Sequence, residues 1–219
     1  MRKPTAGIAA ALSFFLTTAA LPAAFEASVK NEKGAPVADA VVSLVPSTGP
    51  APAFEGESFA VMDQKGMEFV PKVLPVRTGT RVRFPNSDNI LHHVYSFSSP
   101  KPFELPLYKG KTVDPVLFDK PGTVVLGCNI HDWMLGYILI VDTPYFSKTG
   151  GDGLAILRDV PPGEYKAYLW HYGLKDLKKM EAVPVKVIEA GNRTLELKVR
   201  LYPKRITGRM PQTHGGTGY

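Results

Sequence analysis

Short apolar runs recur along the chain between turns rich in proline and glycine, and several of them alternate with polar residues. Alternation with a period of two is typical of half-buried β-strands, and so are β-branched runs bounded by Gly, Pro, Asn or Asp. Short strands at such regular spacing predict an all-β protein built from sandwiches or barrels. The strands that we predict lie at residues 40–45, 67–76, 80–84, 92–98 and 137–142, with a further strand ending at Cys128.

Two longer segments between these strands lack the alternation. Residues 46–58 (PSTGPAPAFEGES) have the composition of a linker, and residues 99–114 (SPKPFELPLYKGKTVD) read as a long proline-rich loop. Residues 174–180 are the one stretch that favours a helical turn. The 20 prolines and 20 glycines among 219 residues agree with a protein of short strands rather than a helical bundle.

The two ends of the chain differ from the part between them. Residues 1–23 carry Arg2 and Lys3, then an apolar run, then small residues, which is the pattern of a secretory signal peptide. Cleavage after Ala20 and cleavage after Ala23 both fit this pattern. We therefore expect a periplasmic protein that is peripheral to a membrane at most. Residues 203–219 show no periodicity and predict a disordered basic tail.

Charge and composition narrow the classes of function. The net charge is +6, from 26 basic and 20 acidic residues, and it falls to +4 once Arg2 and Lys3 are removed. No stripe of basic and aromatic residues indicates a nucleic-acid partner. No Ser, His and Asp order or paired carboxylates suggest catalysis, so we predict that the protein is not an enzyme and find no evident small-molecule substrate. Five histidines in all are too few for a multicopper oxidase with a trinuclear cluster.

The single cysteine raises a chemical question. A lone cysteine in an exported protein cannot form an internal disulfide, so it is free, intermolecular or bound to something. Here Cys128, His131 and Met134 follow one another at intervals of three residues. A thiol, an imidazole and a thioether favour soft metals, and one cysteine excludes an all-thiolate cluster within one chain.

Two histidines with one cysteine and a weak axial methionine describe a blue-copper electron-transfer site. The second histidine would come from residues 86–94 (NSDNILHHV), which offer His92 and His93. Either His92 or His93 could supply this ligand, and a solvated outward-pointing side chain is the simplest role for His93. Zinc is the rival metal, although methionine is a poor zinc ligand.

The segment around these residues resembles the cupredoxins, in particular plastocyanin and amicyanin. The Cys-x-x-His-x-x-Met spacing is similar to the short loop of amicyanin, and His92 lies six residues past Asn86, where this family has its first ligand. The matching stretches are FVP (69–71), GTRVRFPN (79–86), FDKPG (118–122) and CNIHDWM (128–134). The resemblance implies a cupredoxin Greek-key β-sandwich over residues 56–143.

This resemblance also implies a function. It assigns one type 1 copper per chain to His92, Cys128, His131 and Met134. It also assigns a supporting role to Asn86, which would join the two ligand loops by hydrogen bonds. Such a protein would pass single electrons between redox proteins that serve as donor and acceptor. Bacterial proteins of similar appearance are labelled methylamine utilization proteins. A periplasmic copper-binding chaperone and a structural interaction module are the alternatives, with the same ligands.

The flanking segments resemble a second family. ASVKNEKGAPVADAVVSLVP, before the copper segment, and GDGLAILRDVPPGEYKAYLWH, after it, are similar to the two ends of a carboxypeptidase regulatory-like, or transthyretin-like, β-sandwich. The resemblance implies a small transthyretin-like/Ig-like sandwich made of residues 25–55 and 144–202, with the copper domain inserted between them. Two unrelated β segments that pack on the cupredoxin are the alternative.

Overall fold

The computed structural model describes residues 24–52, 56–110, 114–188 and 194–202. The expected signal peptide (residues 1–23) and basic tail (residues 203–219) lie outside the described residues. Within them the structure consists of strands, turns and irregular segments, which confirms the all-β prediction. None of the described residues forms a helix long and apolar enough to cross a membrane.

The strands are short, and several consist of two or three residues. The first ten are β1 Phe25–Asn31, β2 Val41–Pro46, β3 Phe59–Val61, β4 Asp63–Gln64, β5 Phe69–Val70, β6 Val73–Arg77, β7 Thr80–Arg83, β8 His92–Ser96, β9 Phe103–Tyr108 and β10 Val116–Phe118. The others are β11 Gly122–Cys128, β12 His131–Val141, β13 Phe146–Lys148, β14 Leu154–Leu157, β15 Gly163–Trp170, β16 Ala182–Val187 and β17 Thr194–Val199.

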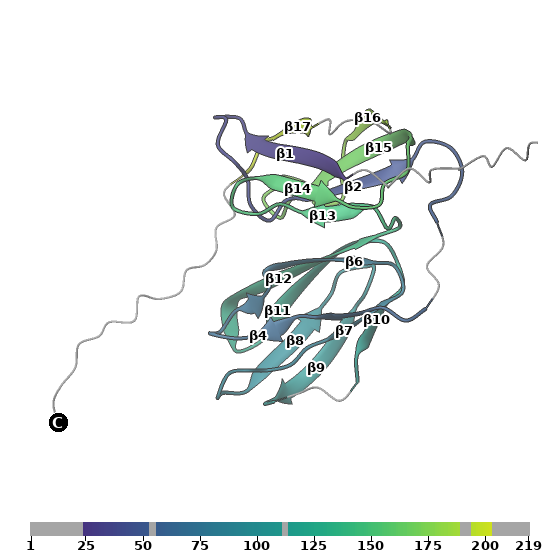
Figure 1. Ribbon diagram of the computed structural model, residues 1–219. Helices are drawn as coiled ribbons and strands as arrows, with labels where there is room; N and C mark the ends of the chain where they lie inside the picture. Colours follow the sequence, from purple (N-terminus) through teal and green to yellow (C-terminus); the bar gives the residue numbers. More distant parts are fainter. Residues whose placement is uncertain (1–23, 53–55, 111–113, 189–193, 203–219) are drawn as a thin grey trace, which may run out of the picture.

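One sandwich is built from the strands in the middle of the chain (Figure 1). Its larger sheet has the order β6-β12-β11-β8-β9, and its smaller sheet has the order β10-β7-β3. The inward side chains of both sheets form one apolar core, because alternate residues of a strand point to the same face. The fully buried members of this core include Met62, Phe84, Phe118, Leu126 and Ile138.

A second sandwich combines strands from both ends of the described chain (Figure 1). Its sheets have the orders β14-β1-β17 and β13-β2-β15-β16, so β1 and β2 pair with strands that follow more than 100 residues later. Buried apolar residues between the sheets include Ala27, Val29, Leu44, Leu157 and Ala167. The two early strands and the five late strands therefore share a core that is separate from the core of the first sandwich.

The two sandwiches contact each other through a third apolar cluster. Trp170 at the end of β15 is fully buried there, beside Val73, Tyr137 and Leu139 of the large sheet. Tyr137 also stacks on Tyr172, with ring centroids 5.2 Å apart. This contact covers part of the outer face of the sheet that carries Cys128.

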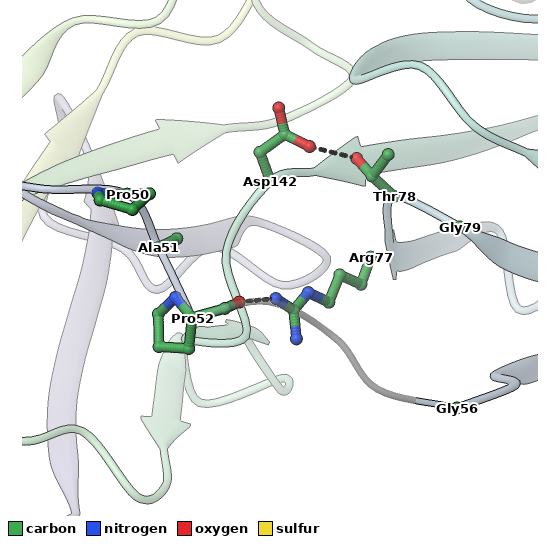
Figure 2. A pocket seen from close by; sticks show the side chains of 8 residues that line it. All are labelled: Pro50, Ala51, Pro52, Gly56, Arg77, Thr78, Gly79 and Asp142. Carbon is green, nitrogen blue, oxygen red and sulfur yellow. Dashed lines mark hydrogen bonds between the residues drawn. The ribbon is translucent and has the colours of Figure 1, made fainter.

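The chain crosses between the sandwiches twice, and both crossings lie at one place (Figure 2). Pro50, Ala51 and Pro52 of the outgoing segment line a cleft together with Asp142, at the start of the return segment. The Arg77 guanidinium donates a hydrogen bond to the Pro52 carbonyl, and the Thr78 hydroxyl donates one to the Asp142 carboxylate. The start and the end of the β3–β12 segment are therefore close in space.

Three of our secondary-structure predictions were wrong in detail. Residues 99–114 contain a six-residue strand, β9, which extends the large sheet beyond β8, although Pro106 lies within it. An edge strand tolerates proline because one side of its backbone needs no partner, so proline content alone misled the interpretation. Residues 67–76 are divided between β5 and β6, and residues 174–180 form turns rather than a helical turn.

Candidate metal centre

A hairpin brings Cys128 and His131 together. β11 ends at Cys128, β12 begins at His131, and the two residues lie directly opposite each other in the antiparallel register. The register shifts between Gly127 and Cys128, which lets the tip of the hairpin depart from regular pairing. As a result the Cys128 Sγ lies 3.6 Å from the His131 Nδ1. The Cys-x-x-His spacing thus places two potential ligands on one rigid turn.

His92 reaches the same place from the neighbouring strand. It begins β8, which pairs with β11 through Tyr95 and Gly127, and its side chain is fully buried. Its Nδ1 lies 3.2 Å from the Nδ1 of His131 and 3.9 Å from the Sγ of Cys128. The three potential ligand atoms all lie within 4.8 Å of one another.

These separations fit a single metal ion. A nitrogen at about 2.0 Å and a sulfur at about 2.3 Å from one metal are roughly 3.5–3.7 Å apart for angles between tetrahedral and trigonal, and two nitrogens are roughly 3.3–3.5 Å apart. The observed distances of 3.6, 3.9 and 3.2 Å are close to these values. The donor set of one thiol and two imidazoles is suited to copper or zinc.

His131 is the partly exposed member of the group, whereas His92 and Cys128 are buried. Burial, together with the proximity of His92, lowers the pKa of His131 from its ordinary value. A lower pKa favours the neutral imidazole, which is the form that binds a metal. The ring of Trp133 lies against it, with centroids 5.3 Å apart.

The two other candidate ligands, Met134 and His93, differ in their position relative to the group of three. Met134 is buried, with 1% of its surface exposed, in the same core cluster as Cys128. His93 lies outside the group of three, and its Nε2 is 2.8 Å from the Glu104 Oε1. We expected the His93 side chain to be solvated, and this was wrong: only 8% of the residue is exposed, because it packs on Tyr95.

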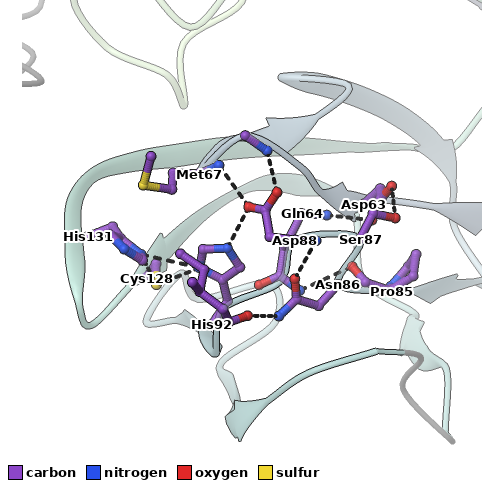
Figure 3. A network of polar contacts seen from close by, with 12 residues as sticks. Asp63, Gln64, Met67, Pro85, Asn86, Ser87, Asp88, His92, Cys128 and His131 are labelled. Carbon is purple, nitrogen blue, oxygen red and sulfur yellow. Dashed lines mark hydrogen bonds and ion pairs between the residues drawn. The ribbon is translucent and has the colours of Figure 1, made fainter. Parts of the chain in front are cut away.

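Asn86 ties the His92 loop to β9. Its Nδ2 donates to the carbonyl oxygens of Ile90 and Tyr108, both at 2.9 Å, and its Oδ1 accepts from the Asp88 amide at 3.0 Å. These bonds stabilise the loop before His92 (Figure 3). None of these three bonds makes the expected link from Asn86 to the cysteine loop, because two lie within the His92 loop and one runs to Tyr108 of β9.

Asp88 is the residue that our sequence reasoning missed. Its Oδ2 lies 2.8 Å from the His92 Nε2, and its two oxygens accept hydrogen bonds from the amides of Gly66 and Met67 (Figure 3). Burial alone would raise the pKa of this carboxyl, but the bonds from Met67, His92 and Gly66 outweigh it and lower the pKa. The available signal was the spacing of four residues between Asp88 and His92.

The larger sheet of this sandwich thus carries a His–Cys–His group, with two of its members on the β11–β12 hairpin and one on β8 beside it. This is the arrangement that the family resemblance implied. Residues 59–141 form a β-sandwich whose group of three potential ligands fits the resemblance to the cupredoxins. The copper-site prediction concerns this sandwich, and the flanking strands lie outside it.

Comparisons with known proteins find solved structures that are similar to part of this chain. Neither the models of known families nor the curated proteins include a match to the sequence. Among solved structures, a reduced variant of amicyanin is 20% identical, with a TM-score of 0.36, over 46% of this chain and 98% of that one. A purple cupredoxin from Nitrosopumilus maritimus is 19% identical, with a TM-score of 0.33, over 38% and 99% of the two chains.

A copper-containing nitrite reductase from Thermus scotoductus SA-01 is also similar. It is 30% identical over 44% of this chain, with a TM-score of 0.36, and the match spans 25% of the reductase. All three matches cover less than half of this chain. The activity of a whole reductase therefore does not follow from this likeness.

Proposed function

We propose that this protein is an exported electron carrier that holds one type 1 copper ion and exchanges single electrons with redox proteins. The observation that supports the proposal is the convergence of the Cys128 thiol with the Nδ1 atoms of His92 and His131. A thiolate with two imidazoles suits both Cu(I) and Cu(II), and the bound copper supplies a one-electron redox couple. We assign electron carriage rather than catalysis to this site.

The protein holds these ligands on rigid elements. His92 belongs to a central strand, and Cys128 and His131 close a hairpin that pairs along most of its length. Ligands that barely move between oxidation states favour fast electron exchange, because little reorganisation is needed. We propose that Met134 would be the fourth ligand of a bound copper ion, because it is buried in the same core cluster as Cys128.

The end of the sandwich that carries the ligands also exposes apolar side chains. Ile90 and Leu91 adjoin His92 in the sequence, Ile130 lies between Cys128 and His131, and between 43% and 50% of each is exposed. Apolar residues exposed together are typical of interaction surfaces. We propose that redox partners dock here, at the partly exposed His131.

We further propose that residues 56–143 are a domain inserted into a discontinuous sandwich of residues 25–55 and 144–202. The shared sheets of β1, β2 and β13–β17 support this division, and so do the adjacent crossings between the sandwiches. Insertion is physically easy where the two ends of a domain lie close together. The N-terminal sequence pattern supports export to the periplasm.

The visible and EPR spectra of the Cu(II)-loaded mature protein test the copper site. An intense thiolate-to-copper band with small copper hyperfine splitting is expected, and it is expected to disappear in Cys128→Ser and in His92→Ala. His93→Ala is the matched control, because His93 is adjacent, buried and outside the ligand group. An ordinary cupric spectrum in the wild type, or a band lost in His93→Ala and kept in His92→Ala, would contradict the assignment.

Electron carriage is separated from metal delivery by the behaviour of the reduced protein. An electron carrier keeps its copper through repeated chemical reduction and reoxidation in the presence of a Cu(I) chelator. Rapid transfer of copper to the chelator on reduction would favour a copper chaperone instead.

A further inference from the structure

A carboxylate supports the buried histidine of the metal centre from behind. The His92 Nε2 faces the Asp88 Oδ2 at 2.8 Å, on the side of the ring opposite to the Nδ1 that faces Cys128 and His131. The Asp88 side chain is 15% exposed and the His92 side chain is fully buried. This contact is shielded from the solvent that would weaken an ordinary surface pair.

Asp88 is held in position by several independent bonds. Its Oδ1 accepts the Gly66 amide at 2.6 Å and its Oδ2 accepts the Met67 amide at 2.9 Å, both from the turn between β4 and β5. Its own amide donates to Asn86. An anchored carboxylate that already accepts two backbone bonds is oriented before any metal arrives.

The direction of the hydrogen bond determines which nitrogen of His92 is available. An ionised carboxylate only accepts hydrogen bonds, so the proton of this contact resides on Nε2. The lone pair of a neutral imidazole then resides on Nδ1, which is the atom within 3.9 Å of the Cys128 Sγ. Asp88 therefore selects the tautomer that points its lone pair into the metal centre.

We propose that Asp88 is a positioning residue that holds His92 in the Nε2–H tautomer and, through its negative charge, lowers the reduction potential of the bound copper. This inference rests on the proposed copper function. A carboxylate on the far nitrogen makes an imidazole ligand more basic. The additional electron density stabilises Cu(II) more than Cu(I), because Cu(II) carries the larger charge.

The chain contains a matched pair for comparison. Glu104 also lies 2.8 Å from a histidine Nε2, but that histidine is His93, outside the ligand group, and the Glu104 side chain is 71% exposed. Asp88→Asn and Glu104→Gln each replace a carboxylate with an amide of the same size. The two substitutions therefore remove the same charge, but at different positions relative to the metal ligands.

The first measurement is the reduction potential of the copper-loaded wild type and of both variants. Loss of a carboxylate partner of a metal-binding histidine typically lowers metal affinity about 10–100-fold. A tenfold loss of Cu(II) affinity that spares Cu(I) raises a one-electron potential by about 59 mV. We expect a rise of at least that size for Asp88→Asn and a much smaller shift for Glu104→Gln.

The second measurement uses the metal-free protein and does not depend on copper. The ¹⁵N shifts of the His92 ring are expected to report Nε2–H and unprotonated Nδ1 in the wild type, and a mixture of tautomers in Asp88→Ala. If Asp88→Asn folds poorly, Asp88→Glu serves as the second variant. It retains the negative charge, so its reduction potential is expected to remain low, as in the wild type.

The outcomes separate this inference from the proposed function. If the wild type lacks the thiolate-to-copper band, the proposed copper function is overturned, whichever tautomer His92 adopts. A normal band with equal potentials in Asp88→Asn and Glu104→Gln overturns the inference alone. Lower stability of Asp88→Asn with an unchanged potential would assign Asp88 a purely structural role and would likewise overturn it.

Discussion

Gly136 lies where added side-chain volume has no room. It pairs with Leu126 in the middle of the β11–β12 hairpin, and a Cβ built on it would lie 2.8 Å from the Phe69 Cβ and 2.9 Å from its Cγ. Phe69 is buried in the core of the first sandwich, with 2% of its surface exposed. The atoms that would clash are at the base of the Phe69 side chain, so the ring cannot simply rotate away and β5 itself would have to move.

Gly136→Ala therefore sets two effects against each other. Replacing glycine with alanine inside a strand stabilises by about 0.5–1 kcal/mol through backbone entropy. Overpacking a well-packed core costs about 1–3 kcal/mol. Because the contact is too short to be absorbed, we expect overpacking to dominate, with a net loss of about 1–2 kcal/mol. With a urea m-value of about 2 kcal/mol/M, the unfolding midpoint would fall by about 0.5–1 M.

The assay is urea unfolding of the metal-free protein, followed by circular dichroism, with Gly127→Ala as the control. A Cβ at Gly127 would meet the Cζ and Oη of Tyr95, the far end of a half-buried side chain that can swing outward. We expect Gly127→Ala to remain within about 0.5 kcal/mol of the wild type. A midpoint for Gly136→Ala at or above that of the wild type would refute the reasoning, because backbone entropy would then have outweighed packing.

Three further predictions concern metal binding, pH and the contact between the sandwiches. Cu(II) at about 1,000 times its Kd should stabilise the folded protein by about 4 kcal/mol in thermal unfolding, and an equal gain in Cys128→Ser would contradict the ligand assignment. Burial raises the pKa of Tyr108 to about 12, and its hydroxyl donates to the Phe84 carbonyl. The folded state therefore favours neutral Tyr108, so stability present below pH 10, the ordinary tyrosine value, should fall as the pH rises through about 12. Urea unfolding should show a smaller loss in Tyr108→Phe, and equal losses would refute this. Trp170→Ala should cost about 3–5 kcal/mol in urea unfolding, because the side chain is fully buried, and a cost below 1 kcal/mol would contradict its packing role.

Local features were predictable because their causes are local. The alternation in residues 80–84 follows from burial of one face of a strand, so the pattern predicts β7 without knowledge of its partners. The Cys-x-x-His spacing lies within one hairpin, and its meaning depends on a two-residue turn. The resemblance to cupredoxins likewise depends on residue types at short, regular intervals.

Features that depend on contacts between distant segments were not predictable in this way. The β9 strand owes its existence to pairing with β8, which overrides the turn-forming tendency of its prolines. The space at Gly136 is limited by Phe69, 67 residues earlier, and no property of the hairpin itself reveals that limit.

The sequence by itself determined the strand-forming segments and the chemical identity of the donors, because both depend on residue type and short-range spacing. The sequence left His93 open as an alternative, and the tertiary structure decided that His92 joins Cys128 and His131. Adjacent strand residues point to opposite faces, so the register of β8 against β11 places one histidine inside the site and turns the other toward Glu104. The same long-range packing brings the β4–β5 turn to Asp88 and thereby aims the carboxylate at His92.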